Sequence, residues 1–282
     1  MFHMAKLKKQ HMTIHWKAIV QDDSSIPATE ATLKEKATLV GRIGLMMLSV
    51  GTGAWRVRNS MNKVARCLGI TCTADIGLLA ISYTCIEGTD TYTQSISNPT
   101  TGVNTHKLME LELFMKEFPD KVSTYSVKHI HEVLDEIQKL PANYKAWNLG
   151  LASALACGAF TFLLGGGPVE MCCAFLGAGV GNFVRKKMLG HSISLLANVA
   201  VSVAASCLVY VLTILLAQSL LSVSAVHQAG YICAMLFVIP GFPLITGGID
   251  LAKLDLRSGL DRVSYALLII LSATMTGWAT AA

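Results

Sequence analysis

The residues with the clearest chemical potential lie in an apolar stretch near the C-terminus, where positions 239–243 read Ile-Pro-Gly-Phe-Pro. Proline removes a backbone donor and clashes with the preceding turn, so a helix is expected to break here. Pro243 suits the first position of a new half-helix, whose partially positive N-terminal end can hold a carboxylate. The pattern predicts a site for a small carboxylate substrate, formed by Pro240, Gly241, Pro243, Thr246 and Asp250. A packing kink is the alternative interpretation.

Other polar residues are candidates for coupling or gating. Glu170 follows Pro168 in an apolar stretch, where it could carry a proton or be an ordinary carboxylate in the first turn of a helix. Asn182 and Asn198 are placed to hydrogen-bond between neighbouring helices. We therefore expect coupling or gating roles at Glu170, Asn182, Asn198 and His106.

Enzymatic chemistry has less support. The polar residues that an enzyme could use are Asp75, Thr100, Thr101 and His106. A threonine nucleophile needs a neighbouring base, and the sequence has no GxSxG, P-loop, HExxH or GxGxxG motif. His129 and His131 lie two residues apart, on different faces of a helix, and make a poor metal pair. We expect no enzyme, no cofactor and no metal site, and keep a membrane-tethered hydrolase-like enzyme or a membrane scaffold as alternatives.

The elements that must position these residues follow from the uneven distribution of charge. The 282-residue chain is 52% hydrophobic and 15% charged, and residues 145–282 hold only 7 of the 23 Lys and Arg and 4 of the 18 Asp and Glu. A soluble domain carries about 25% charged residues, so the second half is expected to lie in a membrane. Five stretches approach the length of a membrane span, and these are 146–164, 169–184, 192–216, 229–249 and 260–280.

The cations between these stretches predict the orientation. They fall only between the second and third stretches and around the start of the fifth, and they are Arg185, Lys186, Lys187, Lys253, Arg257 and Arg262. Positive loops lie on the cytoplasmic side, so the N-terminal half is expected in the cytoplasm and the C-terminus outside. The first 15 residues lack the apolar core of a signal peptide. We expect a multi-pass protein of the bacterial plasma membrane.

The first half has the pattern of a small α+β domain. Helical periodicity covers about 29–51 and continues from 54, and Ile- and Thr-rich segments at 70–75, 77–87 and 91–96 are typical of strands. Helices are expected at about 105–118 and 126–140. The predicted organisation is an N-terminal polar extension (1–28), a cytoplasmic α+β domain (29–144) and a five-helix transmembrane domain (145–282). No basic stretch interleaved with aromatic residues indicates nucleic-acid binding.

Five spans are an odd number, so one copy cannot contain a pair of inverted repeats, the plan of many secondary transporters. The expected partners are therefore the lipid bilayer, a small-molecule substrate and either a second five-helix subunit or another copy of this chain. In the second case the protein would be a homo-oligomer.

Three groups of residues resemble the bacterial threonine/serine exporter family. They are the run 51–57, Gly-Thr-Gly-Ala-Trp-Arg-Val; the run 102–106, Gly-Val-Asn-Thr-His; and 239–243 with Asp250 and the Ser-Gly-Leu of 258–260. The resemblance implies export of small metabolites, coupled to the proton gradient. Similar subunits with one cytoplasmic domain and five spans belong to two-part exporters, including one for succinate, with a small five-span partner. In the family an acidic residue often follows Arg-Val, whereas this chain has Arg58.

Overall fold

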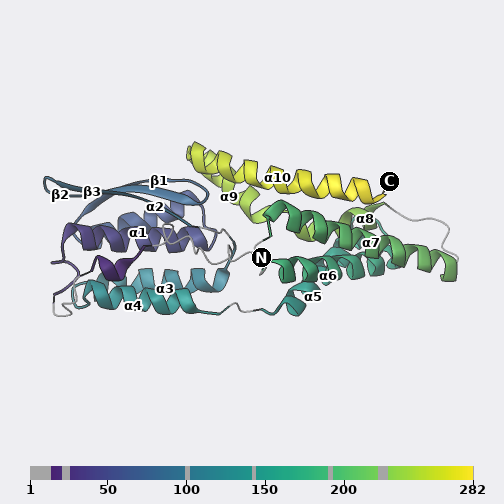
Figure 1. Ribbon diagram of the computed structural model, residues 1–282, viewed down its shortest axis with the longest axis horizontal. Helices are drawn as coiled ribbons and strands as arrows, with labels where there is room; N and C mark the ends of the chain where they lie inside the picture. Colours follow the sequence, from purple (N-terminus) through teal and green to yellow (C-terminus); the bar gives the residue numbers. More distant parts are fainter. Residues whose placement is uncertain are drawn as a thin grey trace, which may run out of the picture. The chain divides into compact units, whose positions relative to one another are not determined.

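The computed structural model describes residues 14–20, 26–98, 102–141, 144–189, 193–221 and 228–281. The chain divides into two compact units (Figure 1). Unit 1 contains Met1–Pro141 together with Phe242–Val263, and unit 2 contains Ala142–Gly241 together with Ser264–Ala282. A segment from the expected membrane domain therefore forms part of the same compact unit as the N-terminal half of the chain.

The sheet of unit 1 is an antiparallel meander of β1 (Thr71–Ile76), β2 (Ala80–Glu87) and β3 (Asp90–Ser97). Its side chains alternate between two faces, as the strand period requires. Tyr83 is buried on the inner face, whereas the hydroxyl groups of Thr84 and Thr93 form a hydrogen bond across the exposed face, 2.9 Å apart. The Ile- and Thr-rich segments of the sequence are thus confirmed as strands.

Four helices complete the N-terminal part of unit 1, and they lie in two layers beneath the sheet (Figure 1). The layer next to the sheet holds α1 (Leu33–Ser49) and α2 (Ala54–Cys67), and the outer layer holds α3 (Thr105–Lys121) and α4 (Val127–Lys139). Thr32 and Glu35 form a capping box at the start of α1. All four predicted helices are confirmed, together with an α+β fold for this part of the chain.

The core of unit 1 depends on a close approach between α1 and the sheet. A Cβ atom on Gly41 would lie 2.2 Å from the hydroxyl oxygen of Tyr83, so only glycine admits the ring at this point. The Tyr83 hydroxyl donates to Gln94 Oε1 at 2.8 Å, which satisfies its polar end. Burial raises the pKa of Tyr83 well above its usual value.

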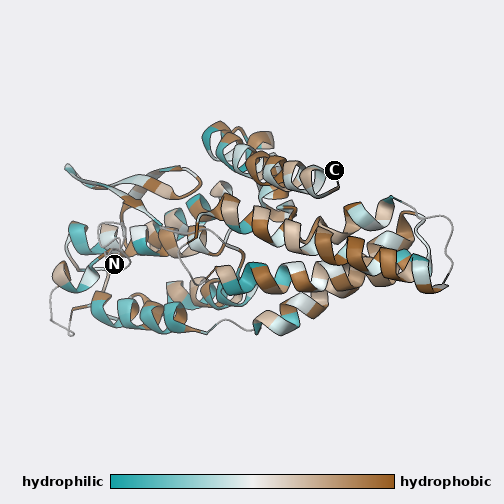
Figure 2. Cartoon of the chain, turned by 45° about the vertical axis from the view of Figure 1, so that its right-hand side comes forward, coloured by the Kyte–Doolittle hydropathy of each residue, from teal (hydrophilic) through white to brown (hydrophobic). Residues whose placement is uncertain are grey.

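Unit 2 is built from helices at the stretches expected to span the membrane. These are α5 (Ala146–Leu163), α6 (Pro168–Met188), α7 (Leu195–Leu221), the short α8 (Ala229–Ala234) with the 3-10 turn η4 (Leu236–Val238), and the second part of α10 (Leu256–Ala281). Hydrophobic residues cover these helices, whereas hydrophilic residues concentrate on unit 1 (Figure 2). A Cβ on Gly177 would lie 2.8 Å from the carbonyl oxygen of Ser206, so α6 and α7 pack closely through small residues.

Three described helices are long and apolar enough to cross a membrane, namely α5, α7 and α10. A fourth span results if the bent pair Ala229–Val238 and Gly241–Ala252 (α9) counts as one. The break between them contains Pro240, as the sequence predicted. The α6 helix, at the second expected span, is not among these candidates; it carries Glu170 near its start and three cations in its last turn. Five spans are thus not confirmed.

His131 is a buried titratable group in unit 1. Its ring stacks on Trp16, with centroids 4.8 Å apart, and its Nδ1 accepts a hydrogen bond from Arg42 at 3.1 Å. Burial lowers the pKa of His131 to about 3, and the charge of Arg42 adds to the effect while Asp135 opposes it. Trp16 thus joins part of the expected polar extension to the core of unit 1.

Because His131 is buried without a proton, we expect the folded protein to become less stable in acid. Between pH 6.5 and about 3 the unfolded chain binds a proton that the folded chain does not, so the free energy of unfolding decreases as the pH falls. The variant His131→Gln should lose this contribution. Apparent melting temperatures of the full-length protein over a pH series measure it, and the exposed neighbour His129→Gln is the control. An equal acid dependence in His131→Gln and wild type would contradict the prediction.

Candidate functional site

Asp250 of α9 lies at the centre of a polar network within unit 1. Its side chain is fully buried, and both carboxylate oxygens accept from the backbone N–H of Ala54 at 3.1 Å. Ala54 begins α2, whose N-cap residue Gly53 has no side chain to offer. A Cβ on Gly53 would lie 3.0 Å from Asp250 Oδ1, so glycine allows the carboxylate to approach. Asp250 therefore caps α2 from outside that helix, where the helix dipole favours a negative charge.

Arg262 of α10 supplies the compensating charge. Its side chain is 3% exposed, and its Nε lies 3.2 Å from Asp250 Oδ2. Ser258 lies one turn earlier, donates to the same carboxylate oxygen at 3.0 Å and accepts from Arg262 Nε at 3.1 Å. The guanidinium also donates to the carbonyl of Thr52 at 2.8 Å. A buried charge requires such pairing because desolvation costs several kcal/mol for each ion.

The predicted residues Thr246 and Asp250 are brought together through this arginine. The Thr246 hydroxyl donates to the carbonyl of Phe242 at 2.9 Å, and it accepts from Arg262 Nη1 at 3.5 Å. Pro243 lies in the first turn of α9, which begins at Gly241 directly after Pro240. The half-helix expected after the proline break is therefore present, and Asp250 lies in its last turn rather than at its N-terminal end.

Two exposed or half-buried ion pairs surround the network. Arg58 binds Asp255 through two hydrogen bonds of 2.6 and 2.8 Å, and the hydrogen bond with Asp255 raises the pKa of Arg58. Arg257 binds Asp75, which the sequence placed among the candidate enzymatic residues. Arg58, the residue that departs from the resembled family, thus contributes an ion pair between α2 and the turn after α9.

In unit 2, the two asparagines connect neighbouring helices. The Asn182 amide donates to the carbonyl of Leu149 at 2.9 Å and to the Ser153 hydroxyl at 2.5 Å, which joins α6 to α5. Asn198 donates to the carbonyl of Arg185 at 3.3 Å, which joins α7 to α6. These contacts are the interhelical hydrogen bonds that the sequence suggested.

Two candidates for coupling or gating remain. Glu170 lies in the first turn of α6 and is only 6% exposed. His106 is half-buried in the first turn of α3. The candidate threonines Thr100 and Thr101 lie outside the described residues.

Sequence reasoning missed the structural role of Arg262. It was grouped with the cations of the membrane boundary, but its guanidinium is buried against Asp250 rather than exposed. The available signal was the spacing of Ser258 and Arg262, four residues apart and therefore on one helix face. Thr52 and Ala54 could not be found this way because they contribute only backbone atoms.

Comparison with known proteins identifies the family. The profile of the ThrE family, described as "Putative threonine/serine exporter", matches residues 38–282. The chain belongs to the ThrE family. All three groups of residues that carried the resemblance lie within the match, and two of them meet in unit 1: the run 51–57 provides the backbone partners of Asp250 and Arg262.

Two curated bacterial proteins that share one name are similar to the chain. The protein "Probable succinate transporter subunit YjjP" of Klebsiella aerogenes is 25% identical over 243 residues, covering 83% of this chain and 90% of its own length. The Escherichia coli K12 protein of that name is 25% identical over 235 residues, covering 83% of this chain and 88% of its own. No solved structure matches the chain. The ThrE family is one of exporters, which at family level implies that the chain is not an enzyme.

The network predicts that replacing Asp250 and replacing Asp255 lower the free energy of unfolding by very different amounts. Asp250→Asn leaves the buried Arg262 without a compensating charge and should lower the free energy of unfolding by about 3–5 kcal/mol. Asp255→Asn removes a pair whose arginine is 34% exposed and should cost only about 1 kcal/mol. Urea or thermal unfolding of the purified full-length protein measures both. Equal losses in the two variants would argue against the network.

Proposed function

We propose that the chain is one subunit of a plasma-membrane exporter of small carboxylate metabolites, either threonine and serine or a succinate-type dicarboxylate. Membership of the ThrE family carries this proposal, and the names of the Klebsiella and Escherichia relatives support the subunit and the dicarboxylate. Export is coupled to the proton gradient. The α+β domain of residues 29–144 lies in the cytoplasm, the C-terminus lies outside, and α5, α6, α7, the α8–α9 pair and α10 form five spans.

The substrate carboxylate binds at the start of α9. The break at Pro240 separates α9 from the preceding turn, and Pro243 lies in its first turn without a backbone N–H. Half-helices that begin within a membrane direct their positive ends toward anionic substrates in other transporters. Asp250 and Thr246 contact Arg262 rather than solvent, and their role in this proposal is to hold α9 in place.

A second five-span subunit completes the transporter. Five spans start on one side of the membrane and end on the other, so a similar partner beginning outside has the opposite topology. The word "subunit" in the names of both relatives supports a partner of this kind. Alternating access then occurs by movement of one five-helix unit against the other.

The transport prediction concerns net efflux. Cells loaded with threonine or succinate should export one of them when this chain is produced together with its partner, and at least about tenfold less when either is absent. Efflux of labelled substrate measures the difference, with an inactive partner gene as control. Unchanged efflux of both substrates after deletion of the gene would contradict the proposal.

Proton coupling is predicted at Glu170, which is buried at the start of α6. The variant Glu170→Gln resembles a permanently protonated carboxyl group. It should lose net efflux against a gradient and retain exchange of labelled for unlabelled substrate, because exchange requires no proton release. Proteoliposome assays separate these activities, and Glu112→Gln on the exposed surface of α3 is the matched control. Net efflux at the wild-type rate would exclude Glu170 as the proton carrier.

A further inference from the structure

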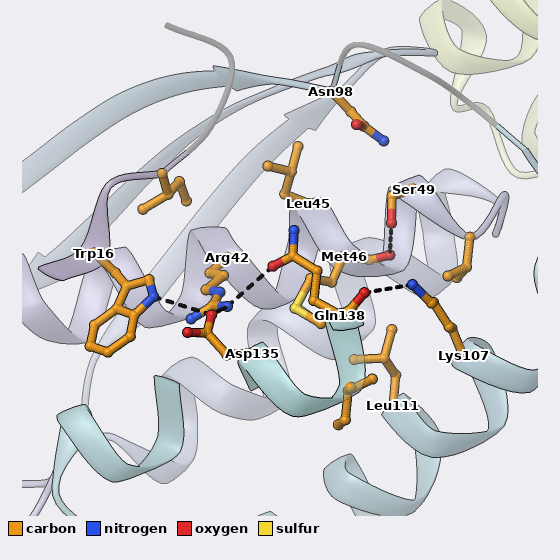
Figure 3. A pocket seen from close by; sticks show the side chains of 13 residues that line it. Trp16, Arg42, Leu45, Met46, Ser49, Asn98, Lys107, Leu111, Asp135 and Gln138 are labelled. Carbon is orange, nitrogen blue, oxygen red and sulfur yellow. Dashed lines mark hydrogen bonds and ion pairs between the residues drawn. The ribbon is translucent and has the colours of Figure 1, made fainter. Parts of the chain in front are cut away.

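Unit 1 contains two features that the proposed transport function does not use. The first is a cavity of about 280 Å³, in which Arg42 binds Asp135 (Figure 3). In the same cavity, Lys107 Nζ donates to the carbonyl of Gln138 at 2.6 Å. These bonds join α1 and α3 to α4, so the charged groups of the cavity serve the packing of the helices. The second feature is a pair of cysteines on neighbouring strands of the sheet.

The thiols of Cys72 and Cys85 lie on the same face of the sheet. The two residues are directly opposite in the register of β1 and β2, and they are only 7% and 0% exposed. Opposed residues of antiparallel strands direct their side chains to one face, which here is the inner face that also holds Tyr83. Both cysteines are free thiols.

The hydrogen-bond pattern of β1 and β2 brings the two cysteines close together. The backbone N–H of Gly77 donates to the carbonyl of Ala80 at 2.8 Å, so these two residues form a hydrogen-bonded pair. Hydrogen-bonded and non-hydrogen-bonded pairs alternate along an antiparallel ladder. Cys72 lies five residues before Gly77, and its pair with Cys85 is therefore non-hydrogen-bonded. The Cα atoms of such pairs are about 4.5 Å apart, within the range of about 4.4–6.8 Å that disulfides show.

The two thiols differ in reactivity. Hydrogen bonding with Cys85 lowers the pKa of Cys72, although burial opposes this effect. The same interaction raises the pKa of Cys85, and burial raises it further. Cys72 also lies on an edge strand of the described sheet, whereas Cys85 lies on the central strand. Because the thiolate is the nucleophile in cysteine chemistry, Cys72 is the member of the pair that reacts first.

We propose that Cys72 and Cys85 form a reversible disulfide when the protein meets a hydroperoxide. The Cys72 thiolate attacks a peroxide oxygen and breaks the O–O bond, which gives a sulfenic acid and a hydroxide that takes up a proton to become water. The Cys85 sulfur then attacks the Cys72 sulfur, and the displaced hydroxide leaves with the Cys85 proton as a second water. In total the two thiols lose two electrons and two protons, and hydrogen peroxide is reduced to two waters.

The disulfide links the central strand to the strand that binds the beginning of α10. Asp75 of β1 forms an ion pair with Arg257. The backbone N–H of Leu78, in the turn between β1 and β2, donates to Asp261 at 3.4 Å. Both α10 residues belong to unit 1. Oxidation therefore adds a covalent bond to the strand through which the sheet contacts α10.

Peroxide treatment of the purified full-length protein tests the pair. After treatment, the remaining thiols are blocked in denaturant, and the chain is cut by trypsin and by a protease that cleaves before aspartate. The peptide 67–74 then carries Cys67 and Cys72, and a separate peptide, 75–89, carries Cys85. Mass spectrometry with fragmentation identifies the linked cysteines. Cys67 is the internal competitor, because it is close in sequence and packs against the same core.

The link between Cys72 and Cys85 should exceed the link between Cys67 and Cys85 at least about tenfold in the folded protein, because the fold holds only the first pair face to face. In denaturant the two links should form in comparable amounts, since the loops that they close differ little in length. Dithiothreitol should remove the link. The variant Cys67→Ser should retain it, and Cys72→Ser should abolish it.

Three results would overturn the proposal. They are equal amounts of the two links in the folded protein, no linked peptide at all, and oxidation of Cys72 to a sulfinic acid without a link. The wild-type protein alone gives these results, so a variant that fails to fold does not affect the conclusion. The assay requires no transport, and its outcome is therefore independent of the exporter proposal.

Discussion

The buried carboxylate of Asp250 imposes the strongest constraint on unit 1. A desolvated charge needs full compensation, and the chain provides it from three places: the first N–H of α2, the Ser258 hydroxyl and the Arg262 guanidinium. Because these groups come from residues about 200 positions apart, one interaction joins the N-terminal helices to α9 and α10. Gly53 makes room for this carboxylate, and Arg58 and Asp255 reinforce the same junction.

This junction explains the structural role of two of the sequence runs that resemble the family. In the run 51–57, the backbone N–H of Ala54 donates to the carboxylate of Asp250. The carbonyl of Thr52, in the same run, accepts from Arg262, the ion-pair partner of Asp250. The polar residues near the end of α9 therefore maintain the architecture of unit 1, and the proposed substrate site is limited to the beginning of α9.

Local patterns in the sequence predicted most elements correctly. Ile- and Thr-rich composition predicted the three strands, apolar periodicity predicted α1 and α2, and Pro240 correctly predicted the break before α9. The partners of Asp250 could not be predicted, since periodicity describes neighbours along the chain and carries no information on contacts such as Asp250 with Ala54. Composition also suggested five spans, whereas the charges at both ends of α6 leave that helix outside the membrane-span candidates.

A double-mutant cycle on Asp250 and Arg262 tests the central interaction most directly. Apparent unfolding free energies of the full-length protein would be compared for Asp250→Asn, Arg262→Gln and the double variant. If the two charges compensate each other, the double variant should be at least about 2 kcal/mol more stable than the sum of the single losses predicts, because neither charge remains unpaired. Strictly additive losses would show that the two side chains do not depend on each other and would contradict the account.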